Sequence, residues 1–257
     1  MMLPIPLQAT LWALLAASGL VLGAAIAVLF QDRLTHRLVA TVMGIGGGVL
    51  IAVLSVDLMT RAFDEGGALA AGSGVLFGAV VFSFCNWRLA QHGARNRKRC
   101  GGCVSQPSED QQKGSGSAIA IGSLLDGIPE SLVIGLSILH GSSVSAGLIV
   151  GFFLSNVPQG LSSAAGMKGA GRSNRYIWTV WIGVVALSGL AATVGSLLLT
   201  STAPVIPAAI LAFAAGGVLA MLAEVMIPEA FEDAQPFMGL ITVLGFLLSF
   251  LIIKLWA

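Results

Sequence analysis

Charged side chains are scarce in this sequence. Only 10% of the 257 residues are Asp, Glu, Lys or Arg, whereas soluble globular proteins carry about 25%. Together with 56% hydrophobic residues and a mean hydropathy of +0.92, this excludes an ordinary soluble domain. The net charge of +1 gives no sign of nucleic-acid binding. No nucleotide-binding motif of the Walker type is present, so we expect no direct coupling to ATP.

Long apolar segments fill most of the chain. Each is long enough to cross a hydrocarbon core of about 30 Å as a helix. They cover residues 7–30, 38–60, 68–90, 118–140, 144–168, 175–200, 205–227 and 236–256. The first has no basic region before it and is too long for the core of a signal peptide, so we expect it to stay as a span. The sequence therefore predicts an all-α membrane protein with eight transmembrane helices in one domain, 1–257.

The basic residues predict how the spans are oriented. Eleven of the thirteen Lys and Arg residues lie after the first, third and fifth spans, and only Arg61 and Lys254 lie on the opposite side. Cytoplasmic loops carry this excess. We therefore expect both termini to be extracytoplasmic. We expect the protein to lie in the plasma (inner) membrane. The segment 91–117, which is basic and then rich in Ser, Gln and Gly, is expected to be a flexible, solvated cytoplasmic loop.

Two pairs of segments resemble each other. "GGVLIAVLSVDLMTRAFDE" (47–65) is similar to "GGVLAMLAEVMIPEAFED" (216–233), and "DGIPES" (126–131) is similar to "SNVPQG" (155–160). In the predicted orientation the members of each pair run in opposite directions, which predicts inverted-repeat symmetry of the kind found in transporters. Chance similarity between glycine-rich helices is the alternative for the first pair.

The second pair brings polar groups into apolar spans. Asp126 and Glu130 are spaced i, i+4 and share one helix face, as do Ser155 and Gln159 on the next span. A charged group at mid-bilayer costs about 2.5–3.5 kcal/mol on insertion, so the two acids require compensation. With Asn156, these side chains offer carboxylate, hydroxyl and amide oxygens, which are ligands for a cation.

Pro129 and Pro158 stand inside the two motifs. Each proline lacks a backbone donor and displaces the carbonyl four residues before it, which adds the oxygens of Leu125 and Leu154 to the potential ligands. The alternative is that the prolines only shape helix packing and that the carboxylates are protonated or paired. No basic residue lies within these two spans except His140 and Lys168 at their edges, so a pairing partner would have to come from elsewhere.

At these residues the sequence resembles the ZIP family of divalent metal transporters. The resemblance implies eight spans, a homodimer, and metal ligands at Asp126, Glu130, Ser155, Asn156 and Gln159. It also implies that helices one, four, five and six move against the others. Zinc is the substrate that the family favours, and iron, manganese or cadmium are alternatives. Asp126 replaces the family's histidine and Gln159 replaces an acidic or histidine ligand. The sixth span has no acid, which predicts one metal rather than two.

Further polar residues could belong to the ion's path. Asp57 lies late in the second span and Glu224 late in the seventh, near opposite membrane faces, and each is either a pathway residue or an interfacial one. Cys100 and Cys103 form a C-x-x-C motif with His92 nearby, but a structural zinc site normally has four ligands. An incidental loop is therefore the better interpretation of this motif.

Three functions fit these observations. A non-enzymatic carrier of divalent cations into the cytoplasm explains both proline motifs. A metal sensor or receptor would keep the binding site without translocation. An intramembrane aspartyl protease could use Asp57 and Asp126, but it leaves the repeated proline motif unexplained.

Overall fold

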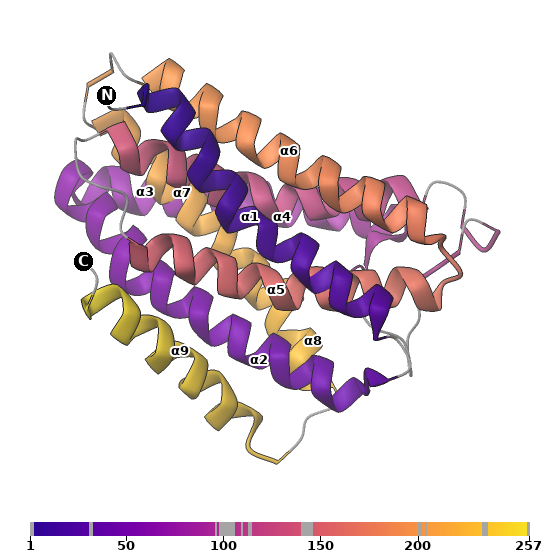
Figure 1. Ribbon diagram of the computed structural model, residues 1–257. Helices are drawn as coiled ribbons and strands as arrows, with labels where there is room; N and C mark the ends of the chain where they lie inside the picture. Colours follow the sequence, from indigo (N-terminus) through magenta and orange to yellow (C-terminus); the bar gives the residue numbers. More distant parts are fainter. Residues whose placement is uncertain are drawn as a thin grey trace.

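The computed structural model describes residues 3–30, 33–95, 97, 106–108, 110–112, 115–139, 146–199, 202–203, 205–232 and 236–255. Over these residues the chain is helical and contains no β-strand (Figure 1). The prediction of an all-α protein is confirmed. Seven helical runs of the described chain are long and apolar enough to cross a membrane, which identifies an integral, multi-pass membrane protein.

The helices follow the predicted apolar segments closely. Their bounds are α1 Ile5–Leu29, α2 His36–Ala52, η2 Val53–Leu58, α3 Met59–Leu89, η3 Ala90–Ala94, α4 Ser115–Leu139, α5 Ala146–Gly169, α6 Asn174–Leu199, α7 Val205–Met221, η4 Leu222–Met226, α8 Ile227–Glu232 and α9 Met238–Leu255. The labels η2, η3 and η4 mark π-helical turns.

One apolar run of 59 residues, 36–94, is broken at Gly67. Gly67 has φ 72° and ψ 174°, a backbone conformation that residues with a Cβ rarely adopt. The break falls between the two segments predicted at 38–60 and 68–90. The two limbs lie against different neighbours, since α2 packs on α9 while α3 packs on α7.

Two groups of helices can be distinguished by their packing. α1, α4, α5 and α6 contact one another mainly through the pairs α1–α5, α1–α6 and α4–α6, whereas the other group consists of the pairs α2–α9 and α3–α7. The groups meet where α2 contacts α5 and where α4 contacts α7. In Figure 1, α1 and α6 lie on one side of the bundle and α9 lies on the other.

Glycines bring the backbones of these pairs together. A methyl group placed on Gly48 of α2 would collide with the carbonyl oxygen of Thr242 in α9. A methyl group on Gly216 of α7 would collide in the same way with the carbonyl of Val75 in α3. Without a side chain, the two helix backbones can approach closely enough for dispersion contacts, which drive helix association in lipid.

The similar segments 47–65 and 216–233 share an unusual turn. In each, a π-helical turn starts six residues after the first glycine of "GGVL", at Val53 in η2 and at Leu222 in η4. Such turns insert an extra residue into the hydrogen-bonding pattern and occur frequently at functional sites. η2 contains Asp57 and η4 contains Glu224.

The glycine contacts lead to a stability prediction. Gly216→Ala should lower the free energy of unfolding by about 1–3 kcal/mol, because the added methyl group forces α7 away from α3. The matched control is Gly72→Ala in α3, where no heavy atom lies within 4 Å of the added group. Thermal unfolding in detergent measures both. An unchanged melting temperature for Gly216→Ala would contradict the close packing.

Candidate functional site

Both proline motifs lie inside long helices, Pro129 within α4 and Pro158 within α5. Each proline ring faces a glycine of the second helix group. A methyl group on Gly46 of α2 would clash with the ring of Pro158, and one on Gly217 of α7 would lie 3.7 Å from Cγ of Pro129. The prolines therefore lie where the two helix groups meet.

All five predicted ligands point into the protein rather than towards lipid. The exposed fractions of these residues are 4% for Asp126, 3% for Glu130, 0% for Ser155, 3% for Asn156 and 2% for Gln159. Polar groups in an apolar interior require hydrogen-bond partners. The contacts of these side chains therefore decide what the site can do.

Glu130 and Asn156 meet across the gap between α4 and α5. The Asn156 amide donates from Nδ2 to Oε2 of Glu130 at 3.0 Å and to the carbonyl oxygen of Ala16 in α1 at 3.2 Å. Ser155 lies beside Asn156, and its hydroxyl donates to the carbonyl of Phe152 at 2.9 Å. Helices α1, α4 and α5 are thus joined around one carboxylate.

A narrow cavity of about 10 Å³, enough room for about one water molecule or one metal ion, lies next to this contact. Four helices enclose it: α1, α4, α5 and α6. Its lining is mostly apolar, with polar groups contributed by Glu130, Ser131, Asn156 and Ser188. A cavity of this size with several oxygen-bearing side chains has room for a single ion or water molecule rather than for a larger ligand.

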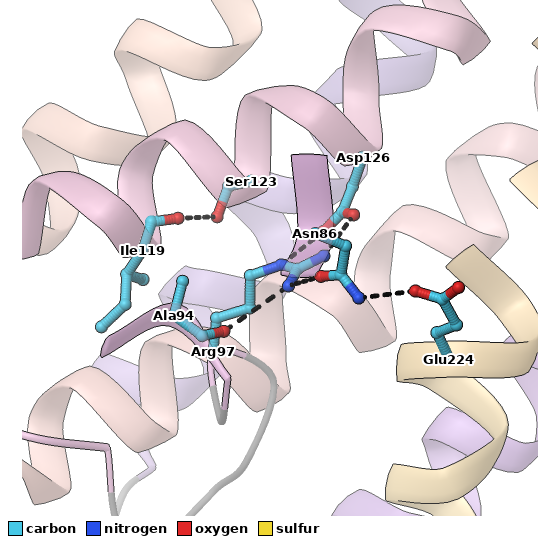
Figure 2. Close-up of polar contacts among 7 residues, drawn as sticks. All are labelled: Asn86, Ala94, Arg97, Ile119, Ser123, Asp126 and Glu224. Atoms are coloured by element: carbon cyan, nitrogen blue, oxygen red, sulfur yellow. Dashed lines mark hydrogen bonds and ion pairs between the residues drawn. The ribbon is translucent and has the colours of Figure 1, made fainter. Parts of the chain in front are cut away.

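Asp126, one turn before Glu130, is held by Arg97 (Figure 2). Arg97 Nη2 lies 2.9 Å from Oδ1 of Asp126, and Arg97 Nε lies 3.2 Å from Oδ2. The guanidinium therefore binds both carboxylate oxygens, which is the strongest arrangement for this pair. Arg97 is 1% exposed, so the ion pair is buried.

The pairing partner of Asp126 comes from the segment 91–117, which the sequence predicted to be solvated. The structure contradicts this prediction at Arg97 and Gln106, because each of these residues is only 1% exposed. The physical reason is the buried carboxylate, since an isolated charge in a low-dielectric interior is far more costly than a paired one. Gln106 fixes the segment by donating from Nε2 to the carbonyl oxygens of Arg97 (2.9 Å) and Ser163 of α5 (3.2 Å).

Arg97 also connects Asp126 to Glu224. Its Nη1 donates to Oδ1 of Asn86 at 2.7 Å, and Asn86 Nδ2 donates to Oε2 of Glu224 at 2.8 Å (Figure 2). Ser83 of α3 donates to the other oxygen of Glu224. Glu224 itself is exposed at the bundle surface. Sequence reasoning missed Arg97 and Asn86, and no periodic pattern distinguishes Arg97 from the basic residues around it.

Asp57 lies in another part of the bundle. One turn after it, Arg61 donates to the hydroxyl of Ser137 near the end of α4 at 2.9 Å. Ser137 is 11 residues after Asp126, which is about 16 Å along the helix. Oδ2 of Asp57 is buried and has no hydrogen-bond partner in the described part of the chain. The two pathway candidates, Asp57 and Glu224, are therefore associated with different stretches of α4.

This separation matters for the protease alternative. A pair of catalytic aspartates must lie close enough to share one proton. The carboxylate of Asp126 is instead bound on both oxygens by Arg97, and the residues around Asp57 contact α4 near Ser137. In the described part of the chain, these contacts associate the two aspartates with different stretches of α4.

The proposed loop motif is only partly described. Cys100 and Cys103 lie outside the described residues. His92 is exposed, and its Nδ1 donates to the carbonyl of Arg88 at 2.9 Å. No group of three or more His, Cys, Asp or Glu residues within metal-binding distance occurs in the described part of the chain. A cation at Glu130 would therefore take amide, hydroxyl, carbonyl or water oxygens besides carboxylate.

Comparison with models of protein families and with curated proteins finds no match to this chain. The contacts of Asp126, Glu130 and Asn156 are therefore the basis for assigning a function.

The buried ion pair predicts strong coupling between Arg97 and Asp126. Asp126→Leu alone should lower the free energy of unfolding by about 3–5 kcal/mol, because it leaves Arg97 buried without its counter-charge. Adding Arg97→Met should restore most of that loss. Denaturant-induced unfolding in mixed micelles gives both values, with Arg95→Met as the control, since Arg95 is exposed. If the decreases in the free energy of unfolding caused by the two single substitutions simply add in the double variant, the coupling is refuted.

Proposed function

We propose that the protein is a transmembrane carrier of divalent metal cations, which binds its substrate between α4 and α5 and moves it into the cytoplasm. The observation that carries this proposal is the buried contact of Glu130 with Asn156 beside a cavity enclosed by four helices. Ionisable residues inside membrane spans are costly and mark ion pathways. The buried Asp126, one helical turn away, adds a second carboxylate to the same helix face.

The ligand chemistry favours a hard or borderline cation. Glu130, Asp126, Ser155, Asn156 and Gln159 supply only oxygen donors if the amides bind through their carbonyl groups. Oxygen donors suit Mn²⁺ and Mg²⁺ better than they suit soft metals, and zinc and iron also accept them. The ZIP-like motifs favour zinc. A divergent member of that family with altered metal preference accounts for both observations.

The packing supports an eight-span topology with inverted repeats. Consider an exchange of α1 with α6, α2 with α7, α3 with α9 and α4 with α5. It converts the main contacting pairs into one another and leaves the pair α1–α6 unchanged. Under this exchange α2–α9 becomes α3–α7, and α1–α5 becomes α4–α6. The equivalent π-helical turns η2 and η4 agree with the same relation. We therefore propose inverted repeats, with both termini extracytoplasmic.

Transport would proceed by movement of the site-bearing group against the other helices. α1, α4, α5 and α6 surround Glu130 and the cavity, whereas α2, α3, α7 and α9 form the second group. Contacts of Pro158 with Gly46 and of Pro129 with Gly217 lie between the groups, where the absence of a glycine side chain would leave room for the helices to shift. Asp57 and Glu224 would attract the cation on the outer and inner sides of the site.

The membrane potential is a sufficient driving force. A cation of charge +2 gains about 4.6 kcal/mol per 100 mV of inside-negative potential on moving inwards. Uptake down this gradient needs no nucleotide. We propose that the protein works as a homodimer surrounded by membrane lipid, without a nucleic-acid partner.

Flux into reconstituted vesicles tests the proposal. Wild-type protein should transport at least one of Zn²⁺, Mn²⁺, Fe²⁺, Cd²⁺ and Mg²⁺ at a rate that increases with inside-negative potential. Glu130→Gln should reduce that rate by at least about tenfold, because it removes a ligand charge while keeping the side-chain shape. Asp126→Asn should also reduce it, and Gly72→Ala is the control.

Two outcomes would reject parts of this function. Equal flux by wild type and Glu130→Gln would show that the site is wrongly assigned. Metal binding that depends on Glu130 without flux in any variant would favour the metal sensor over the carrier.

A further inference from the structure

Arg97 is a basic side chain that contacts one of the predicted ligands, Asp126, on both carboxylate oxygens. We propose that Arg97 is a tethered counter-cation, which occupies Asp126 when the site is closed on the side of the segment 91–117 and must leave Asp126 before a divalent cation can pass there. This inference rests on the proposed transport function. It assigns to Arg97 the role of controlling when the Asp126 carboxylate is available to the cation.

The position of Arg97 supports closure. Along α4, which begins at Ser115, Gly122 comes one turn before Asp126, and Glu130 comes one turn after it. The Arg97 side chain lies against Gly122 and ends at Asp126, whereas the cavity adjoins Glu130. The guanidinium is thus between the cavity and the beginning of α4. A cation leaving Glu130 in that direction would meet a fixed positive charge.

The surface of α4 is shaped to receive Arg97. A methyl group on Gly122 would lie 2.6 Å from Cδ of Arg97 and 2.9 Å from its Nε. Any larger residue at position 122 would push the side chain out of its place. Gly122 therefore provides a space that the arginine fills, and a substitution there can displace Arg97 without removing either charge of the ion pair.

The contacts of Arg97 join several elements. Besides Asp126 of α4, its guanidinium binds Asn86 of α3, which in turn binds Glu224 of η4. Its backbone carbonyl accepts a bond from Gln106, which also binds Ser163 of α5. Because α4 and α5 belong to one helix group while α3 and η4 belong to the other, these bonds hold the two groups together at this end.

The ion pair also sets the charge of the site. With Arg97 bound, Asp126 and Arg97 together contribute no net charge, so Asp126 adds little attraction for a cation at Glu130. When Arg97 leaves, Asp126 is available as a second carboxylate. The guanidinium and a divalent cation therefore compete for Asp126, and binding of one weakens binding of the other.

Accessibility of a reporter thiol tests closure without requiring transport. Ser163→Cys, a buried position bonded to Gln106 through its carbonyl, is introduced into the full chain carrying Cys85→Ala, Cys100→Ser and Cys103→Ser. A membrane-impermeant thiol reagent is applied to each side of sealed vesicles. Labelling from the side of the segment 91–117 should be slow with Arg97 present and at least about tenfold faster in Arg97→Gln and in Gly122→Ala.

Arg95→Gln is the matched control, because Arg95 belongs to the same segment but is exposed. Labelling in this variant should stay slow. Gly122→Ala retains both charges, so faster labelling there cannot be attributed to a missing arginine. Size-exclusion profiles identify misfolded variants, and Arg97→Lys, which keeps the charge but not the two-point contact, replaces Arg97→Gln if that variant is misfolded. Equal labelling rates in all folded variants would overturn the closure.

Zinc binding to purified protein tests the competition. Removing Arg97 by Arg97→Gln should lower the Kd for Zn²⁺ by about tenfold or more, and the additional change Asp126→Asn should abolish that gain. An unchanged Kd in Arg97→Gln would overturn the inference while leaving the carrier function intact. Absence of Zn²⁺ binding and flux in every variant would instead reject zinc transport, and the labelling rates would still decide whether Arg97 closes the site.

Discussion

The structure depends on how two carboxylates are accommodated in an apolar interior. Asp126 and Glu130 lie one turn apart on α4, and both are almost fully buried. The two carboxylates are accommodated in different ways. Asp126 receives a full counter-charge from Arg97, whereas Glu130 receives an amide from Asn156 and adjoins a cavity. Under the proposed function, Glu130 is the carboxylate that a cation in this cavity would meet.

Small residues make this accommodation possible. Gly122 gives room for the side chain of Arg97, and Gly46 gives room for the ring of Pro158. Glycines along α2 and α7 also let these helices approach α9 and α3 until backbone atoms are in contact. A soluble helical protein would lose stability from so many glycines, but in lipid the close approach is itself the source of helix association. Packing and function therefore use the same residue type.

Much of this arrangement could be predicted from the sequence because it follows from apolar length and helical spacing. The long apolar runs predicted nearly every helix, and the i, i+4 spacing correctly predicted that Asp126 and Glu130 share a face. The break between the second and third segments falls at Gly67, where the backbone needs a positive φ. The glycine-rich segment "GIGGG" (44–48) includes Gly46 and Gly48, which pack within this chain against α5 and α9.

The role of Arg97 could not be predicted in the same way. It stands in "GARNRKRC", where no periodicity applies and every basic residue is an equally good candidate for solvent. Its burial results from tertiary contacts with two residues. Asp126 lies far from Arg97 in the sequence, and Asn86 lies on the preceding helix α3. The π-helical turns η2 and η4 were missed for a similar reason, since one extra residue in a helix leaves the apolar pattern unchanged.

The most direct measurement is the position of a bound metal in crystals of the full chain soaked with Zn²⁺ or Mn²⁺, located by anomalous scattering. The account predicts a peak between α4 and α5 at about 2.0–2.2 Å from a carboxylate oxygen of Glu130, with oxygen atoms of α5 completing the ligand set. A peak that forms only away from Glu130, or that persists unchanged in Glu130→Gln, would contradict it.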